Sequence, residues 1–116
     1  MQRLIATVLP VLCLAASAAW AQSAPQRYLI EREIPGASKT PPEEFRLGAA
    51  KSNAVLRELG PDIQWVHSYV AGDKVYCIYQ ATNEDLIREH AAKSGFPATK
   101  VTPIAAVLDP TTAGRR

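Results

Sequence analysis

Residues 63–79 constrain the fold of this chain most, because their side chains alternate in character on both sides of a Gly72-Asp73 pair. Alternation that flanks a two-residue turn of this kind is typical of a β-hairpin. Such a turn places Tyr69 opposite Tyr76 and His67 opposite Ile78. The chain is therefore expected to build a sheet around this hairpin.

The hairpin has two chemically different faces, because successive side chains of a strand point to opposite sides. The face that suits a buried core holds Val66, Val70, Val75, Cys77 and Tyr79. The other face holds Trp65, His67, Tyr69 and Tyr76. Aromatic rings and an imidazole are unusual on a face that meets only water, so we expect this second face to contact a ligand or a partner.

The sequence on either side of the hairpin predicts two more strands and two helices. Residues 27–34 alternate like a first strand. Residues 40–59 have helical spacing, with Thr40 as a cap, a capping box to Glu43, and a Gly60-Pro61 stop. Their expected buried positions are Phe45, Ala49, Ser52, Leu56 and Leu59.

The second helix is predicted between an Asn83 cap and the ending Gly95-Phe96-Pro97. Its buried stripe is expected to be Leu86, Ile87, His90 and Ala91. Residues 100–108 predict a last strand. Pro103 within it cannot donate to a strand ladder, which favours a position at the sheet edge.

The element order β-α-β-β-α-β predicts a ferredoxin-like α+β sandwich, a four-stranded antiparallel sheet with two helices on one face. The other face stays open. Half-apolar open faces commonly pack against a second sheet, so we expect a homodimer.

The first 21 residues predict a secretory signal peptide. Arg3 precedes an apolar run from Leu4 to Leu14, and Ala19-Trp20-Ala21 fits a cleavage site. Cleavage after Ala21 leaves a polar leader at residues 22–26, one domain at 27–112 and a polar tail at 113–116. We expect a periplasmic or secreted protein with no stable membrane insertion after cleavage.

The charge and the cysteine content narrow the classes of partner. Arg3 is the only charged residue among the first 21, so its removal lowers the formal charge from +2 to +1. No basic run stands out, which argues against nucleic acid as a partner. Cys77 is the only cysteine left after cleavage, and its apolar neighbours favour burial over disulfide or metal chemistry.

Five residues are candidate metal ligands. His67 ranks first, because imidazole binds transition metals and titrates near neutral pH. Glu31 and Glu33 lie two apart on the first strand, and on the open face they would project beside His67 and suit Ni, Zn, Cu or Fe. His90 lies near a helix C-terminus, where a charged imidazole is stabilised, and a structural role is favoured for it. Cys77 is the last candidate.

Three segments carry a resemblance to a known family. They are residues 28–36, residues 63–70 with 73–77, and residues 87–91 with 95–97 and Asp109-Pro110-Thr111. They resemble the DUF4242 group of small bacterial proteins, also described as nickel-binding proteins with a ferredoxin-like fold. The resemblance implies a dimeric α/β protein with nickel near the sheet, although another divalent transition metal fits the same donors. The positions it favours as ligands are His67, Glu31 and His90, with Glu33 and Cys77 behind.

Three functions follow as hypotheses. The first is an exported homodimer that binds a transition metal, nickel foremost, without catalysis. The second is an enzyme of the dimeric α/β barrel type, with His67 as its acid–base group and Trp65 and Tyr69 lining the pocket. The third is a non-catalytic interaction module whose aromatic face forms the dimer.

Overall fold

The computed structural model describes Pro10 and residues 24–114. The predicted signal peptide, apart from Pro10, lies outside the described residues. The helices and strands run in the order β1 (Gln26–Glu33), η1 (Ala37–Lys39), α1 (Pro42–Leu59), β2 (Ile63–Ala71), β3 (Lys74–Ala81), α2 (Glu84–Ser94), β4 (Lys100–Pro103) and η2 (Pro110–Ala113).

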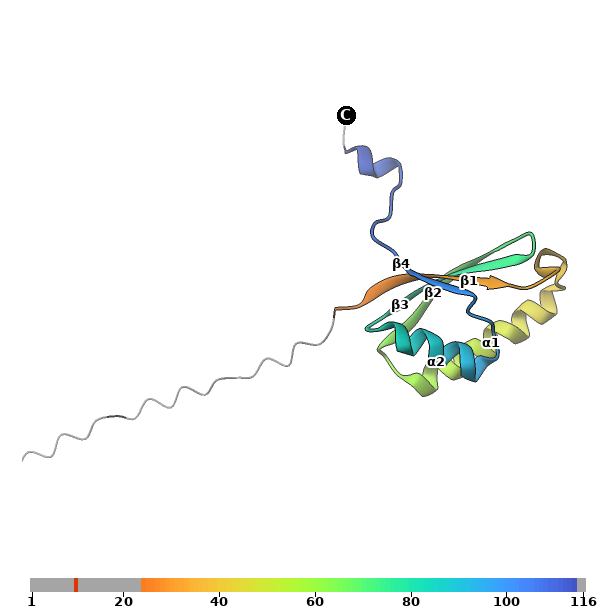
Figure 1. The fold of residues 1–116 in the computed structure, drawn as a ribbon, viewed down its shortest axis with the longest axis horizontal. Helices are drawn as coiled ribbons and strands as arrows, with labels where there is room; N and C mark the ends of the chain where they lie inside the picture. The colour runs from red at the N-terminus through yellow and green to blue at the C-terminus, as the bar shows by residue number, and fades with distance from the viewer. Residues whose placement is uncertain (1–9, 11–23, 115–116) are drawn as a thin grey trace, which may run out of the picture.

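The four strands form one antiparallel sheet in the order β2-β3-β1-β4. Both α-helices lie on the same side of the sheet, and no helix of the described residues covers the opposite side (Figure 1). This arrangement confirms the predicted ferredoxin-like fold. It also places β2 and β4 at the two edges of the sheet, as the proline in β4 predicts.

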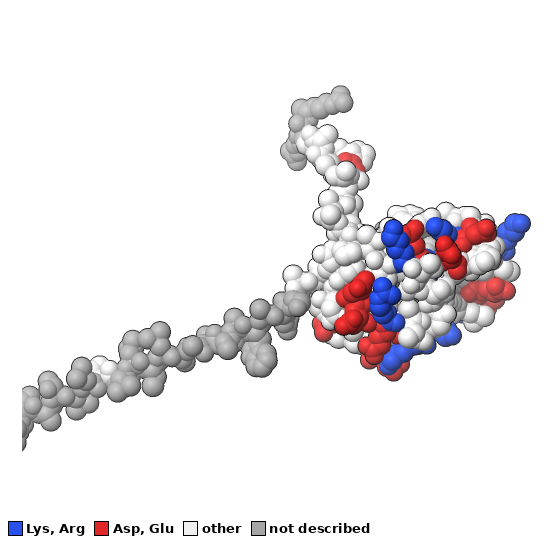
Figure 2. All heavy atoms as spheres, viewed as in Figure 1, with Lys and Arg blue, Asp and Glu red and all other residues white. Residues whose placement is uncertain are grey.

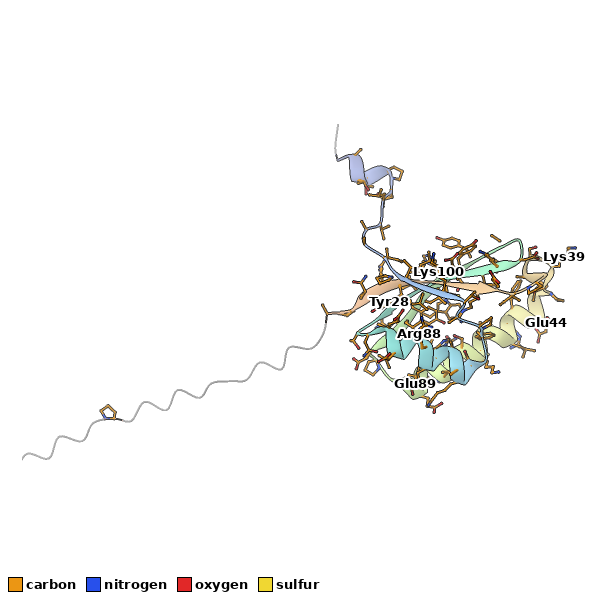
Figure 3. The ribbon with its side chains drawn as sticks, in the orientation of Figure 1. Tyr28, Lys39, Glu44, Arg88, Glu89 and Lys100 are labelled. Atoms are coloured by element: carbon orange, nitrogen blue, oxygen red, sulfur yellow. The ribbon has the colours of Figure 1, made fainter. Side chains whose placement is uncertain are left out.

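The core lies between the sheet and the helices, where side chains fill the space between the two layers (Figure 3). Ile30 is fully buried and packs with residues of β2, β3 and α2. The buried cluster consists of Tyr28, Ile30, Ile63, Cys77, Tyr79, Ala81 and Ile87. Charged side chains of the outer layer, such as Lys39, Glu44 and Glu89, lie at the rim of the molecule instead (Figure 3).

The hairpin register agrees with the prediction near its turn. Gly72 has a φ of 59°, and Tyr69 pairs with Tyr76 while His67 pairs with Ile78. Farther from the turn, a β-bulge between Trp65 and His67 places Val66 as an extra residue. Trp65 therefore pairs with buried Tyr79 and packs against the core.

Two predictions for the hairpin are wrong, and the bulge explains the one for Trp65. The expected place of Trp65 on the open face beside His67 is wrong, because one extra residue reverses the side to which the preceding side chain points. The expected burial of Val66 and Val70 is also wrong, since each is 40% exposed. Packing of the large indole against the core stabilises the bulged arrangement over regular alternation.

The ends of the helices agree with the prediction at three of four places. Asn83 caps α2, because its Oδ1 accepts a hydrogen bond from the Leu86 backbone N–H at 3.0 Å. Gly60 and Gly95 end α1 and α2. The predicted Thr40 cap is wrong. Pro41 holds the cap position of α1 without a side-chain hydrogen bond, and Glu43 pairs with Arg46 instead.

Two further predictions need correction. Phe45 is 40% exposed on α1 and does not belong to the core, while Val55 is buried without having been predicted. The last strand ends at Pro103 and does not continue to residue 108. The backbone N–H of Ile104 donates to the Arg27 carbonyl, and β1 begins at Gln26, one residue before Arg27. The partner strand β1 therefore has almost no residues left to pair with the chain beyond Pro103.

Among the described residues, no helix is both long and apolar enough to cross a membrane.

Candidate functional site

The open face of the sheet holds His67, Tyr69 and Tyr76 as the sequence predicts, but not Trp65. Glu31 on β1 pairs across strands with Tyr76 on β3, and Tyr76 pairs with Tyr69 on β2. The adjacent row of the same face contains His67 opposite Ile78. The central strand β3 therefore separates Glu31 from His67, and all five side chains share the face that the helices leave free.

His67 is exposed and reaches solvent directly. Its ring meets the ring of Tyr69 edge-on, with ring centroids 4.9 Å apart and planes at 75°. This ring–ring contact does not occupy the imidazole nitrogens, which form no hydrogen bond to any other described residue. His67 is thus an accessible nitrogen donor that faces away from the core.

Glu31 is more shielded than a typical surface carboxylate. Its side chain is 21% exposed, and Lys74 Nζ lies 3.8 Å from its Oε1. Glu33 is exposed, and Thr99 Oγ1 accepts a hydrogen bond from its backbone N–H at 3.1 Å. The two carboxylates remain available to a cation, with the lysine as the competing partner of Glu31.

His90 on α2 and Cys77 on β3 are both buried in the layer between the helices and the sheet. His90 is completely buried, and its Nε2 lies 3.0 Å from Ser52 Oγ. Ser52 Oγ also lies 3.3 Å from the hydroxyl of Tyr79. Burial lowers the pKa of His90 to about 4, and the nearby positive charge of Arg32 acts in the same direction. The expectation of a charged imidazole stabilised by the helix dipole is therefore wrong, because this ring is neutral at pH 7.

Cys77 is buried, as the sequence predicts, and accepts two hydrogen bonds at its sulfur. Ser68 Oγ donates from 3.0 Å and Arg32 Nε from 3.4 Å. Trp65 Nε1 donates in turn to Ser68 Oγ at 2.9 Å. The thiol is thus enclosed by donors of its own chain.

Arg32 is the residue whose importance the sequence analysis missed. It is 3% exposed, and its Nη1 donates to the carbonyls of Phe96 and Pro97 at 3.2 and 2.8 Å. Its guanidinium also lies 5.9 Å from the centre of the Phe96 ring. The signal was present, because the alternation of β1 places Arg32 on the same face as Tyr28 and Ile30.

The sheet therefore divides the five predicted ligands into two groups. His67, Glu31 and Glu33 share the open face, and His90 and Cys77 lie in the core. No cluster of three or more histidine, cysteine, aspartate or glutamate side chains with metal-binding geometry occurs within the described part of one chain. Two surface hollows lie elsewhere, one beside Pro61 and Gln80 and one beside Leu56 and Trp65, and neither is lined by His67 or Glu31.

Comparison with known proteins places this chain in a family. The family model described as "Nickel responsive protein SCO4226-like" matches residues 28–104. The chain belongs to this family. The match agrees with the nickel-related family that the resemblance implied, and it extends from Tyr28 in β1 to Ile104 just after β4.

A solved structure shows the same fold. The structure is similar to the crystal structure of SCO4226 from Streptomyces coelicolor A3(2), with a TM-score of 0.59 at 10% sequence identity. The matched region covers 71% of this chain and 99% of that chain. At this identity the likeness shows the fold alone. No curated protein matches the sequence.

Proposed function

We propose that this protein is an exported homodimer that binds a divalent transition metal, nickel foremost, through the open face of its sheet, without catalysis. The observation that supports the proposal is the position of His67, Glu31 and Glu33 on the one sheet face that the helices leave free, in a member of a nickel-responsive family. The resemblance to the DUF4242 group favours the same function.

The donor chemistry fits nickel. Imidazole nitrogen and carboxylate oxygen are ligands that suit Ni, Cu, Zn and Fe better than Ca or Mg. His67 is exposed with a free ring, and Glu31 is partly desolvated, which strengthens its attraction for a cation. A metal bound here would displace Lys74 from Glu31.

One chain does not gather a full set of donors. β3 lies between His67 and Glu31, so they are two strand spacings apart, about 10 Å across the sheet. This separation agrees with the absence of a three-donor cluster in the described residues. We therefore propose that a second copy supplies the remaining donors, or that water completes the coordination.

His90 and Cys77 are not proposed as direct ligands. His90 is fully buried beside Ser52 and Tyr79, and Cys77 already accepts hydrogen bonds from Ser68 and Arg32. Opening the core to a metal would leave these buried partners without hydrogen bonds, which costs about 1–3 kcal/mol for each group. The proposed ligand set is therefore His67 and Glu31, with Glu33 as the neighbouring carboxylate.

Export is the second part of the proposal. Residues 1–21 have the pattern of a signal peptide, with cleavage after Ala21. A periplasmic or secreted protein meets metal ions before they enter the cytoplasm, so sequestration outside the cytoplasm is the role that this location favours.

The metal content and the mass of the protein recovered from cells test the proposal. Tag-free protein is recovered from the periplasm of nickel-supplemented cells, and elemental analysis by mass spectrometry gives its metal content. We expect near-stoichiometric nickel, and an intact mass that corresponds to a chain beginning at Gln22. Protein that carries no transition metal and shows no nickel binding on titration would contradict the metal-binding role, whereas an uncleaved chain would contradict export alone.

A further inference from the structure

The described part of the chain ends in an apolar segment whose side chains beyond Ile104 are exposed. Residues 104–108 read Ile-Ala-Ala-Val-Leu, and Val107 and Leu108 are 63% and 77% exposed. Figure 1 shows this segment, with η2 at its end, standing away from the sheet on the side opposite the helices. We refer to residues 104–114 as the C-terminal arm.

The arm is uncharged along its apolar part. Figure 2 shows it as white spheres with a single red group, and Asp109 is the only charged residue among residues 104–114. Asp109 caps η2 by accepting a hydrogen bond from the Thr111 backbone N–H at 2.8 Å. The apolar run therefore ends in a locally ordered turn. All but the first residue of the arm lies beyond the region that matches the family.

The backbone of the arm also lacks partners. The Ile104 N–H donates to the Arg27 carbonyl at 2.8 Å, and Gln26 Nε2 donates to the Ile104 carbonyl at 2.9 Å. Residues 105–108 make no hydrogen bond to any other described residue. Four consecutive residues thus present apolar side chains together with free backbone donors and acceptors, which is the character of a strand that is missing its sheet.

The opposite edge of the sheet has the matching character. β2 pairs with β3 on one side only, and its five residues after the bulge, His67–Ala71, contain no charge and no proline. Tyr69 on this strand is 59% exposed, and Val66 and Val70 are each 40% exposed. Natural edge strands are usually protected by charge or proline. The arm and β2 together hold five of the seven exposed large hydrophobic side chains in the described residues.

The two surfaces do not meet within one chain, because β4 and β2 form opposite edges of the sheet and the arm departs from β4. We propose that the C-terminal arm of one copy adds alongside the β2 edge of a second copy, and that the second copy returns the same contact. A reciprocal exchange of this kind has twofold symmetry and closes as a dimer. It covers the apolar side chains of the arm and of the β2 edge, and it lets their unpaired backbone groups form hydrogen bonds with each other. It also places the arm beside His67 of the other copy.

The exchange is tested on the full-length coding sequence, with the protein recovered as the cell processes it. Sedimentation equilibrium at several concentrations compares the wild type with Val107→Asp/Leu108→Asp on the arm and with Tyr69→Asp on β2. All three side chains are exposed, so the variants are expected to fold like the wild type. Each substitution alters both of the symmetric contacts between an arm and a β2 edge, so we expect the dimer dissociation constant to rise about tenfold or more.

Leu47→Asp serves as the matched control, because Leu47 is 54% exposed on α1 and belongs to neither surface. We expect it to leave the dimer unchanged. A mixture of the arm variant and the β2 variant gives the most specific test. In a heterodimer, the intact arm of the β2 variant can pair with the intact β2 edge of the arm variant. The mixture is expected to form heterodimers more tightly than either variant forms homodimers. A wild type that is monomeric, or a dimer that both variants leave intact, would overturn the exchange whatever the result of nickel binding.

Discussion

The burial of His90 predicts a specific loss of stability in acid. Its pKa is lowered from 6.5 to about 4 in the folded protein, chiefly by burial and further by Arg32. The unfolded chain therefore binds the proton more tightly than the folded chain does. Stability is complete above about pH 6.5 and falls as the pH decreases toward 4.

The magnitude follows from the two pKa values. They differ by about 2.5, and each pH unit of difference corresponds to about 1.4 kcal/mol, so the loss amounts to about 3 kcal/mol between pH 7 and pH 3.5. Since a domain of this size is stable by about 5–15 kcal/mol, this loss is a large share of its stability. Glu43 and Asp109 have lowered pKa values from hydrogen bonds to Arg46 and Thr111, so they add a separate acid loss at lower pH.

A comparison with His90→Gln isolates the histidine. Glutamine keeps a polar atom near Ser52 and does not titrate, so the carboxylates act equally in both proteins. Urea unfolding followed by circular dichroism at half-unit steps from pH 7.5 to 3.5 gives the two free energies. We expect the wild type to lose about 3 kcal/mol more than the variant over this range. Parallel pH profiles for the two proteins would refute the account of a buried neutral imidazole.

Three further substitutions test how the fold is held, each by the free energy of unfolding in urea at pH 7. Asn83→Ala removes the cap of α2 and should cost about 1 kcal/mol, whereas no loss would mean that the hydrogen bond to Leu86 contributes nothing. Ile30→Ala empties a fully buried site and should cost about 2–5 kcal/mol, and a loss below 1 kcal/mol would contradict its place in the core. Arg32→Ala leaves the carbonyls of Phe96 and Pro97 without their donor and should cost about 2–4 kcal/mol, while a variant as stable as the wild type would show that the buried charge is not needed.

The sequence predicted the topology because local signals and hydrophobic period agree along most of the chain. The Gly72-Asp73 turn determines the pairing of Tyr69 with Tyr76, and the Asn83 cap marks the start of α2. These features depend on neighbouring residues alone. The placement of Glu31 and His67 on one face then follows from strand period and from the strand order.

The details that the sequence did not predict depend on contacts between distant residues. The bulge at Val66 exists because Trp65 packs into a core made by other elements, and alternation carries no sign of it. The neutral state of His90 depends on its burial and on Arg32, 58 positions earlier in the chain. The length of β4 is limited by the residue at which its partner strand β1 begins. The pattern of residues 100–108 carries no information about that partner.

Nickel titration of the wild type, His67→Ala and His90→Gln tests the central claim most directly. Isothermal titration calorimetry on metal-free protein at pH 7.5 compares a histidine on the open face with a histidine in the core. We predict stoichiometric, sub-micromolar binding in the wild type and in His90→Gln. For His67→Ala we predict a loss in affinity of about a hundredfold or more, beyond the roughly 10–100-fold that loss of a ligand's hydrogen-bond partner costs. Unchanged binding in His67→Ala would contradict the assignment of the site to the open face, and unchanged binding there with a loss in His90→Gln would move the metal into the core.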